Sequence, residues 1–180
     1  MKTFSVLVTN DGIYLIPIVA AVAWLLSDRP TKASMAVAGA VTLGLVGILV
    51  LASAAAWFDP RPFAVDGHPP LVPHVADNGF PSDHTTMAAA IAGVVLAYRR
   101  RIGIALLLAA GLVGASRVTV HVHHVPDVVG GFAIGLAAAA VGVWFARRSL
   151  ERWQAWRSQR PVSTDPVHPL DATIAASRRP

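Results

Sequence analysis

Two short polar segments interrupt an otherwise apolar sequence, and their residue types suit phosphate chemistry. In the first, PSDHTT, the residues Ser82, Asp83 and His84 are consecutive. The second lies between residues 116 and 127 and contains one arginine, three histidines and an aspartate: Arg117, His121, His123, His124 and Asp127. Arginine and serine bind phosphate oxygens, and histidine can transfer a phosphoryl group or a proton. The two segments are therefore the first candidates for a functional site.

The arginines and the serine predict a phosphate-binding site. Arginine presents a planar fork of donors that matches phosphate oxygens, and it stays charged. Arg61 and Arg117 together indicate a doubly anionic ligand. Ser82 follows a proline and precedes an apolar run, so it is a predicted helix N-cap. The backbone N–H groups of Asp83 and His84 would then lie at the positive end of a helix, where phosphate binds well.

Hydrolysis of a bound phosphate needs a nucleophile, and histidine is the predicted one. The sequence has no cysteine, so a thiolate nucleophile and disulfide chemistry are excluded. It also has no Gly-rich Walker segment. A histidine can attack when a carboxylate orients its other ring nitrogen, and His123 and Asp127 are four residues apart. His84 remains as the general acid for the leaving group.

Composition places these polar segments in a membrane protein. Of the 180 residues, 54% are hydrophobic and only 14% are charged, which is unusual for a soluble domain. Five apolar runs are candidates for crossing a bilayer: residues 13–26, 33–58, 85–98, 102–116 and 128–146. The third run is short, about 17 residues or roughly 25 Å if its helix begins at Ser82. We predict an all-α fold, a polytopic membrane bundle of about five transmembrane helices; a soluble protein with buried helices is the alternative.

The basic residues predict the orientation of this bundle, because lysine and arginine accumulate in short cytoplasmic loops. Most of them follow the first, third and fifth apolar runs: Arg29, Lys32, Arg99, Arg100, Arg101, Arg147, Arg148, Arg152, Arg157, Arg160, Arg178 and Arg179. The opposite side has only Lys2, Arg61 and Arg117. Five crossings then place the amino terminus and both polar segments outside and the carboxyl terminus in the cytoplasm. The net charge of +5 thus reflects topology, and no nucleic-acid partner is expected.

Both ends of the sequence leave alternatives open. Residues 1–12 are only partly apolar and form either an interfacial segment or the beginning of the first helix. Residues 21–23, Ala-Val-Ala, resemble a signal-peptide cleavage site, but cleavage would disturb the arrangement of the basic loops. From Pro161 onward the chain is rich in Pro, Ser and Thr. We predict a membrane domain over residues 1–148 and a basic, largely disordered cytoplasmic tail over residues 149–180.

Small residues at every fourth position predict close packing between helices. One stripe consists of Ala36, Ala40 and Gly44, and another of Gly131 and Gly135. Such spacing places the small residues on one face, where the backbone of a second helix can approach. Helix packing alone explains these stripes, so no functional role is assigned to them.

The polar blocks resemble the three-part motif of the type 2 phosphatidic acid phosphatase (PAP2) superfamily. The blocks are Arg61-Pro62, then Pro81-Ser82-Asp83-His84, then Ser116-Arg117 followed by His123 and Asp127. The stretch FDPRPFAVDGHPPLVPHVADNGFPSDHTT is more similar still to bacterial undecaprenyl-diphosphatases of the bacitracin-resistance type. In these, an aspartate likewise replaces the usual glycine of the second block. The resemblance extends from the first apolar run to the fifth and excludes the tail.

The resemblance implies a role for each residue of these blocks. His123 would attack phosphorus to give a phosphohistidine while Asp127 holds its ring. His84 would protonate the leaving phosphate and then activate the hydrolytic water. The phosphoryl oxygens would be bound by Arg61, Ser82, Arg117 and the backbone N–H of Asp83. The resemblance implies no metal and no cofactor.

The sequence departs from the broad PAP2 pattern at two positions. A lysine of the family corresponds here to Ala54, which removes one phosphate contact and disfavours vanadium-haloperoxidase activity. His74 or His68 would replace this contact, or both are ordinary loop histidines. Asp83 either shapes the substrate site or is simply a first-turn residue favoured by the helix dipole. His124 is a further candidate for contact with the substrate.

Three functions remain open from the sequence. The first is a phosphatase at the outer face of the bacterial plasma membrane, which releases phosphate from undecaprenyl or a similar polyprenyl diphosphate so that the carrier can be reused in cell-envelope synthesis. The second has the same chemistry on phosphatidic acid, phosphatidylglycerol phosphate or a polyprenyl phosphosugar phosphate. The third is a non-enzymatic, His-rich protein that binds zinc or copper, which leaves the arginines unexplained. The expected partners are a lipid-linked phosphate and the bilayer, and the oligomeric state is left open.

Overall fold

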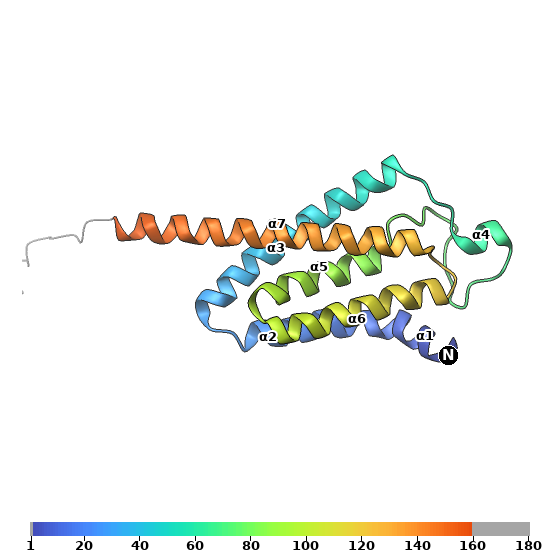
Figure 1. Ribbon diagram of the computed structural model, residues 1–180, viewed down its shortest axis with the longest axis horizontal. Coiled ribbons are helices and arrows are strands. Elements are labelled where there is room, and N and C mark those ends of the chain that lie inside the picture. The colour runs from blue at the N-terminus through green and yellow to red at the C-terminus, as the bar shows by residue number, and fades with distance from the viewer. Residues whose placement is uncertain (1, 160–180) are drawn as a thin grey trace, which may run out of the picture. The chain divides into compact units, whose positions relative to one another are not determined.

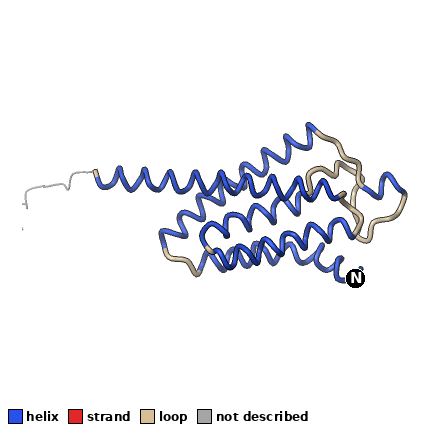
Figure 2. The backbone as a smooth tube through the Cα atoms, viewed as in Figure 1, coloured by secondary structure: helices blue, strands red, loops and turns tan. Residues whose placement is uncertain are grey.

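The computed structural model describes residues 2–159, and in this range every regular element is a helix (Figures 1 and 2). The elements are α1 (Lys2–Leu7), the π-helical η1 (Val8–Gly12), α2 (Ile13–Leu25), α3 (Arg29–Ala56), α4 (Pro62–Asp66), α5 (Asp83–Tyr98), α6 (Arg100–Thr119) and α7 (Val125–Ser158). The predicted all-α class is confirmed. Residues 160–180, most of the predicted tail, lie outside the described residues.

Four helical segments in the described range are long and apolar enough to cross a membrane. They are Thr3–Leu25, Arg29–Ala56, Arg100–Thr119 and Val125–Ser158. The first unites α1, η1 and α2, so residues 2–12 are the beginning of the first helix. Thr9 in η1 also donates a hydrogen bond to Ser116 of α6 over 2.8 Å, which ties this segment to the bundle. The third of the five predicted crossings corresponds to α5, which has 16 residues, about 24 Å, and is the shortest of them.

The short helix α5 lies at the centre of the packing. One buried cluster joins α2, α5 and α6 through Ile16, Ala88, Ala92, Leu106 and Val113. A second cluster joins the opposite side of α5 to α3 and α7, with members Ala38, Val94, Ala139, Val143 and Ala146. A helix that is apolar all round is expected to be buried, and the many alanines of α5 let its neighbours approach closely.

The glycines of α7 allow close contact with α5, as their spacing predicts. A Cβ at Gly135 would collide with the carbonyl oxygen of Thr86, and a Cβ at Gly131 would lie 2.7 Å from the Thr86 hydroxyl. The prediction for α3 is wrong, because Ala36, Ala40 and Gly44 are exposed and Gly44 has nothing within 4 Å of a built Cβ.

The stripe of α3 that is buried in the bundle is offset by two residues from the predicted one. It consists of Ala38, Thr42 and Val46, and Thr42 meets Gly142 of α7. Two residues correspond to about 200° of helix rotation, so this stripe lies on the opposite face. Both stripes have four-residue spacing and small or apolar members, so spacing alone does not distinguish the buried face from the exposed one.

Basic residues gather at one end of the bundle and the polar loops at the other. At the basic end, Arg99 donates to the carbonyl of Leu26 over 3.0 Å, and Arg147 donates to that of Ala97 over 3.1 Å. The loop between α3 and α5 and the turn between α6 and α7 lie together at the opposite end (Figure 2). The helices thus hold the polar segments away from the basic loops.

The chain divides into two compact units, Met1–Arg148 and Ser149–Pro180. The first contains the helical bundle and all of the polar segments singled out above. In the second, the described residues 149–158 are helical, and the guanidinium of Arg157 lies 4.3 Å from the ring centroid of Trp153.

Candidate active site

Asn78 fixes the loop that carries the first arginine. Its amide oxygen accepts hydrogen bonds from the backbone N–H groups of Asp59, at 2.9 Å, and Phe80, at 3.0 Å. Its amide nitrogen donates to the carbonyls of Ala54, at 3.1 Å, and Trp57, at 2.9 Å. This side chain therefore fastens the loop to the end of α3, and the backbone of Ala54 contributes to that anchor. Sequence reasoning did not single out Asn78.

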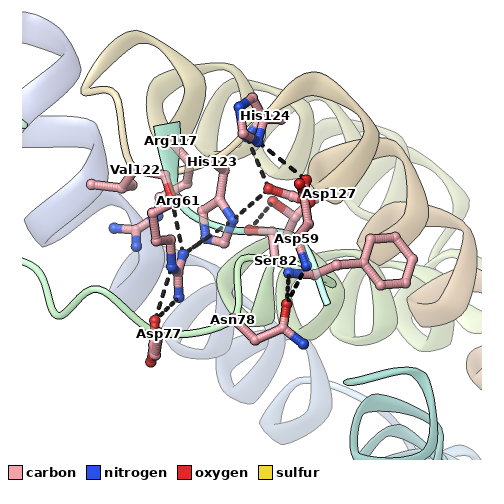
Figure 3. Close-up of polar contacts among 12 residues, drawn as sticks. Asp59, Arg61, Asp77, Asn78, Ser82, Arg117, Val122, His123, His124 and Asp127 are labelled. Carbon is pink, nitrogen blue, oxygen red and sulfur yellow. Dashed lines mark hydrogen bonds and ion pairs between the residues drawn. The ribbon is translucent and has the colours of Figure 1, made fainter. Parts of the chain in front are cut away.

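Arg61 follows this anchor and is directed toward His123 (Figure 3). The guanidinium is buried, and its Nε and Nη2 lie 2.9 and 2.8 Å from Oδ1 of Asp77. Its Nη1 donates to the carbonyl of Val122 over 3.1 Å and lies 2.9 Å from Nε2 of His123. Asp77 thus holds one side of the fork and leaves the other side facing the imidazole.

His123 has a carboxylate on its other ring nitrogen. Its Nδ1 lies 3.3 Å from Oδ2 of Asp127, which is fully buried and also accepts a hydrogen bond from the backbone N–H of His124 at 2.9 Å. Burial lowers the pKa of His123 below its ordinary value, against the hydrogen bond to Asp127, which raises it. A neutral imidazole with Nδ1–H donating to Asp127 has its lone pair on Nε2, the arrangement that a nucleophilic histidine needs.

Arg117 lies in the last turn of α6 with a free donor. The residue is 4% exposed, and its Nη2 lies 3.2 Å from Nε2 of His74. Its Nε has no hydrogen-bond partner among residues 2–159. A buried donor without an acceptor is costly, and an anion would satisfy it.

His74 belongs to the site and His68 does not. The His74 ring centroid is 6.4 Å from that of His123, and burial, reinforced by Arg61 and Arg117, lowers the pKa of His74 to about 4. A neutral His74 can accept the hydrogen bond from Arg117. The side chain of His68 is 81% exposed and lies beside Asp66.

Ser82 occupies the N-cap position of α5, as predicted, but its side chain makes no capping hydrogen bond. Its hydroxyl instead pairs with that of Thr85 at 3.0 Å, and its backbone N–H donates to the carbonyl of Asp127 over 3.1 Å. The residue is fully buried. Ser82 thus joins the beginning of α5 to the beginning of α7, beside the His123–Asp127 pair.

The two residues after Ser82 have different surroundings. His84 is half-buried, and its imidazole forms no hydrogen bond within the part of the chain that the structure describes. Asp83 is exposed and lines a groove whose other walls come from α3 and α5: Leu43, Val46, Gly47, Val50, Leu51 and Met87. His84 is therefore free to exchange a proton, and Asp83 marks the border between the polar site and an apolar surface.

His124, a predicted substrate contact, pairs instead with Asp59. Its Nδ1 lies 3.1 Å from Oδ2 of Asp59. Burial and the neighbouring Asp127 raise the pKa of Asp59. Neither Asp59 nor Asp77 was assigned a role from the sequence; their only signal is a position within the polar stretch around Arg61 and Pro81.

His123 lies between a guanidinium and a carboxylate. Nη1 of Arg61 lies 2.9 Å from its Nε2 and 3.2 Å from its Nδ1, and Oδ2 of Asp127 lies 3.3 Å from Nδ1 (Figure 3). Arginine donors beside the ring and a carboxylate on Nδ1 allow the ring to attack an anion that the arginines hold. The geometry therefore suits phosphoryl transfer to a histidine.

Comparison with known proteins agrees with this arrangement. Residues 35–151 match the family model of the PAP2 superfamily, which is more than half of the chain. The chain belongs to the PAP2 superfamily and is a multi-pass membrane phosphatase, and the predicted resemblance is confirmed.

The chain is also similar to individual relatives and solved structures. The chain is 32% identical over 150 residues to undecaprenyl-diphosphatase BcrC of Bacillus subtilis (strain 168), covering 83% of this chain and 75% of that protein. The crystal structure of Aquifex aeolicus LpxE superposes with a TM-score of 0.63 at 25% identity, over 79% of this chain and 84% of the other. A phosphatidylglycerolphosphate phosphatase from Bacillus subtilis gives a TM-score of 0.48 at 22% identity, over 81% and 94%.

Proposed function

We propose that this membrane phosphatase hydrolyses undecaprenyl diphosphate, or a similar polyprenyl diphosphate, to the monophosphate and inorganic phosphate. The observation that carries the proposal is the position of His123, whose Nδ1 is held by Asp127 at 3.3 Å while Nη1 of Arg61 lies 2.9 Å from Nε2. The printed name of the relative from Bacillus subtilis supports the choice of substrate.

The reaction proceeds in two steps through a phosphohistidine. Nε2 of His123 attacks the terminal phosphorus, and the bond from phosphorus to the bridging oxygen breaks. His84 donates a proton to this oxygen, so the lipid monophosphate leaves. Water, losing a proton to His84, then attacks the phosphohistidine and releases inorganic phosphate. Arg61 and the free Nε of Arg117 stabilise the charge that develops on the phosphoryl oxygens.

The groove beside Asp83 supports a lipid-linked substrate. It has a volume of about 400 Å³ and is apolar except for Asp83. Its walls include Val46 and Val50 of α3 and Met87 of α5. An apolar tail bound in this groove would bring its diphosphate head group to the amino end of α5, near the hydrogen-bond donors that would bind phosphate. In this proposal Asp83 lies where the tail meets the diphosphate.

The positive-inside rule supports an orientation in a bacterial plasma membrane. Basic loops at the end formed by Arg29, Arg99 and Arg147 would face the cytoplasm. The site at the opposite end would then face outward, toward the periplasm or the cell exterior. The carboxyl terminus after α7 would be cytoplasmic.

Phosphate release from two lipids tests the proposal. The protein is purified in detergent with EDTA and offered undecaprenyl diphosphate and phosphatidic acid in parallel. We expect release from the diphosphate, abolished in His123→Ala and retained in the matched control His68→Ala, whose side chain is exposed outside the site. Persistent release by His123→Ala would refute the nucleophile. Release from phosphatidic acid alone would assign the enzyme to another lipid phosphate.

A further inference from the structure

Three side chains of the types that ligate metal ions lie close together beside His123. They are Asp59 from the loop after α3, and His124 and Asp127 from the turn into α7 (Figure 3). One donor atom from each, two carboxylate oxygens and an imidazole nitrogen, can be chosen so that all lie within 4.8 Å of one another. The proposed phosphatase mechanism does not use His124 or Asp59.

The buried carboxylate of this cluster has an unused oxygen. Oδ2 of Asp127 lies against His123 and accepts the backbone N–H of His124. Oδ1 is buried and has no hydrogen-bond partner in the described range. An unsatisfied buried carboxylate oxygen is costly, and here a second carboxylate, Asp59, stands beside it. The guanidinium of Arg61 is already paired with Asp77, and its Nη1 lies against both ring nitrogens of His123.

We infer that Asp59, His124 and Asp127 form a binding site for a divalent transition-metal ion of the Zn²⁺ class, and that the bound ion inhibits the phosphatase. The inhibitory part rests on the proposed function, whereas the binding part does not. Two carboxylates and one imidazole neutralise the ion and leave a coordination position for water. The nitrogen ligand favours Zn²⁺ over Mg²⁺ and Ca²⁺, which prefer oxygen ligands.

The geometry needs little adjustment to bind the ion. Zn²⁺ holds nitrogen and oxygen ligands at about 2.0–2.2 Å, so tetrahedral ligand atoms lie about 3.3–3.5 Å apart. Nδ1 of His124 and Oδ2 of Asp59 are already 3.1 Å apart. The side chain of His124 is 39% exposed and that of Asp59 is 26% exposed, so an ion can reach them from solvent. Asp127, which is fully buried, would supply the third ligand from the interior.

Inhibition follows from the double role of Asp127. In the proposed reaction its carboxylate holds Nδ1–H of His123 and stabilises the positive charge that the ring gains on attack. An ion bound to the same carboxylate draws away that negative charge. Nε2 of His123 then becomes a weaker nucleophile, so the filled site slows phosphate release.

Metal binding tests the site without any substrate. Protein stripped with EDTA and then freed of chelator is titrated with Zn²⁺ by calorimetry. We expect one ion per chain, with the affinity lowered at least about tenfold in Asp59→Asn and in His124→Gln. Asp66→Asn is the matched control, because Asp66 also pairs with a histidine, His121 at 2.8 Å, but outside the cluster. Absence of saturable binding, or equal affinity in Asp59→Asn, would overturn the site.

An activity series then tests the inhibition. Added Zn²⁺ should lower phosphate release from undecaprenyl diphosphate, EDTA should restore it, and Asp59→Asn should need at least about ten times more Zn²⁺ for the same loss. Release unchanged at saturating Zn²⁺ would refute inhibition. Stoichiometric binding by a protein that hydrolyses neither lipid would support the metal site and contradict the proposed function. Hydrolysis of undecaprenyl diphosphate by a protein that does not bind Zn²⁺ would support the proposed function and contradict the metal site.

Discussion

His123 is the residue around which the site is organised. Nη1 of Arg61 lies near both of its ring nitrogens, closer to Nε2, and Asp127 lies at Nδ1. Each of these partners is itself fixed, Arg61 by Asp77 and Asp127 by the backbone N–H of His124. In the proposed reaction, a nucleophile held in this way would lose little freedom when a phosphate arrives, so its orientation would be part of the catalytic contribution.

Asp127→Asn should show whether Asp127 orients the ring of His123 for catalysis or only contributes to folding. The amide keeps the size of the carboxylate but cannot hold Nδ1–H of His123 with its charge, so the wrong tautomer becomes accessible. We expect kcat to fall by about 10³–10⁴-fold, as for the corresponding change in a serine–histidine–aspartate triad. Initial rates of phosphate release measure this, and the thermal midpoint shows whether the variant folds. A kcat within tenfold of the wild type would contradict the role of Asp127.

His74 should make the stability of the protein depend on pH. Its pKa is about 4 in the folded protein and 6.5 when unperturbed, because burial and the two arginines disfavour the charged form. Between these values the unfolded chain binds a proton that the folded chain does not, so stability falls as the pH is lowered through this range. In detergent, the thermal midpoint should drop less from pH 7 to pH 5 in His74→Gln than in the wild type. Equal drops would exclude this contribution.

At the scale of elements, the beginning of α5 is in close contact with the beginning of α7. Ser82 donates its backbone N–H to Asp127, and the Thr86 side chain and carbonyl lie against Gly131 and Gly135. His84, the proposed general acid, belongs to α5, and His123, the proposed nucleophile, lies in the turn just before α7, so the contact between these helices affects the position of both. The separation between these helices is what the glycines determine.

Gly135→Ala should widen this separation. The added Cβ would collide with the carbonyl of Thr86 and lie 2.9 Å from the backbone nitrogen of Ala90, and neither atom can move without shifting α5. We expect a loss of about 1–3 kcal/mol in stability, with reduced phosphate release. Gly111→Ala in α6 is the control, because a Cβ there meets nothing within 4 Å and should leave the thermal midpoint unchanged or higher. Equal midpoints for the two variants would refute the packing argument.

Contacts between residues close in the sequence could be predicted, whereas contacts between distant residues could not. The pairing of His123 with Asp127 follows from a four-residue spacing at the beginning of a helix, and it was predictable. The contacts of Arg61 with Asp77 and of His124 with Asp59 depend on the path of the loop, which Asn78 fixes through four hydrogen bonds. Nothing in composition or periodicity encodes that path.

At the scale of the molecule, the helices of the bundle hold the candidate active site at one end and the basic loops at the other. The candidate active site lies at one end, and at the other end Arg99 and Arg147 donate hydrogen bonds to backbone carbonyls near the ends of α2 and α5. The guanidinium of Arg147 also lies 5.9 Å from the ring centroid of Tyr98. Such an arrangement favours one orientation in a membrane, because the basic end is retained in the cytoplasm.

Cysteine labelling tests that orientation directly. The sequence has no cysteine, so a single introduced thiol is the one target in the chain. Val75, 72% exposed in the loop at the site, and Arg101, exposed at the basic end, mark the two sides. In bacterial protoplasts a membrane-impermeant maleimide should label Val75→Cys, and Arg101→Cys should react only after permeabilisation, because the positive-inside rule predicts that the basic loops face the cytoplasm. The reverse pattern would place the site in the cytoplasm, and a substrate displayed on the outer leaflet would then be out of reach of His123.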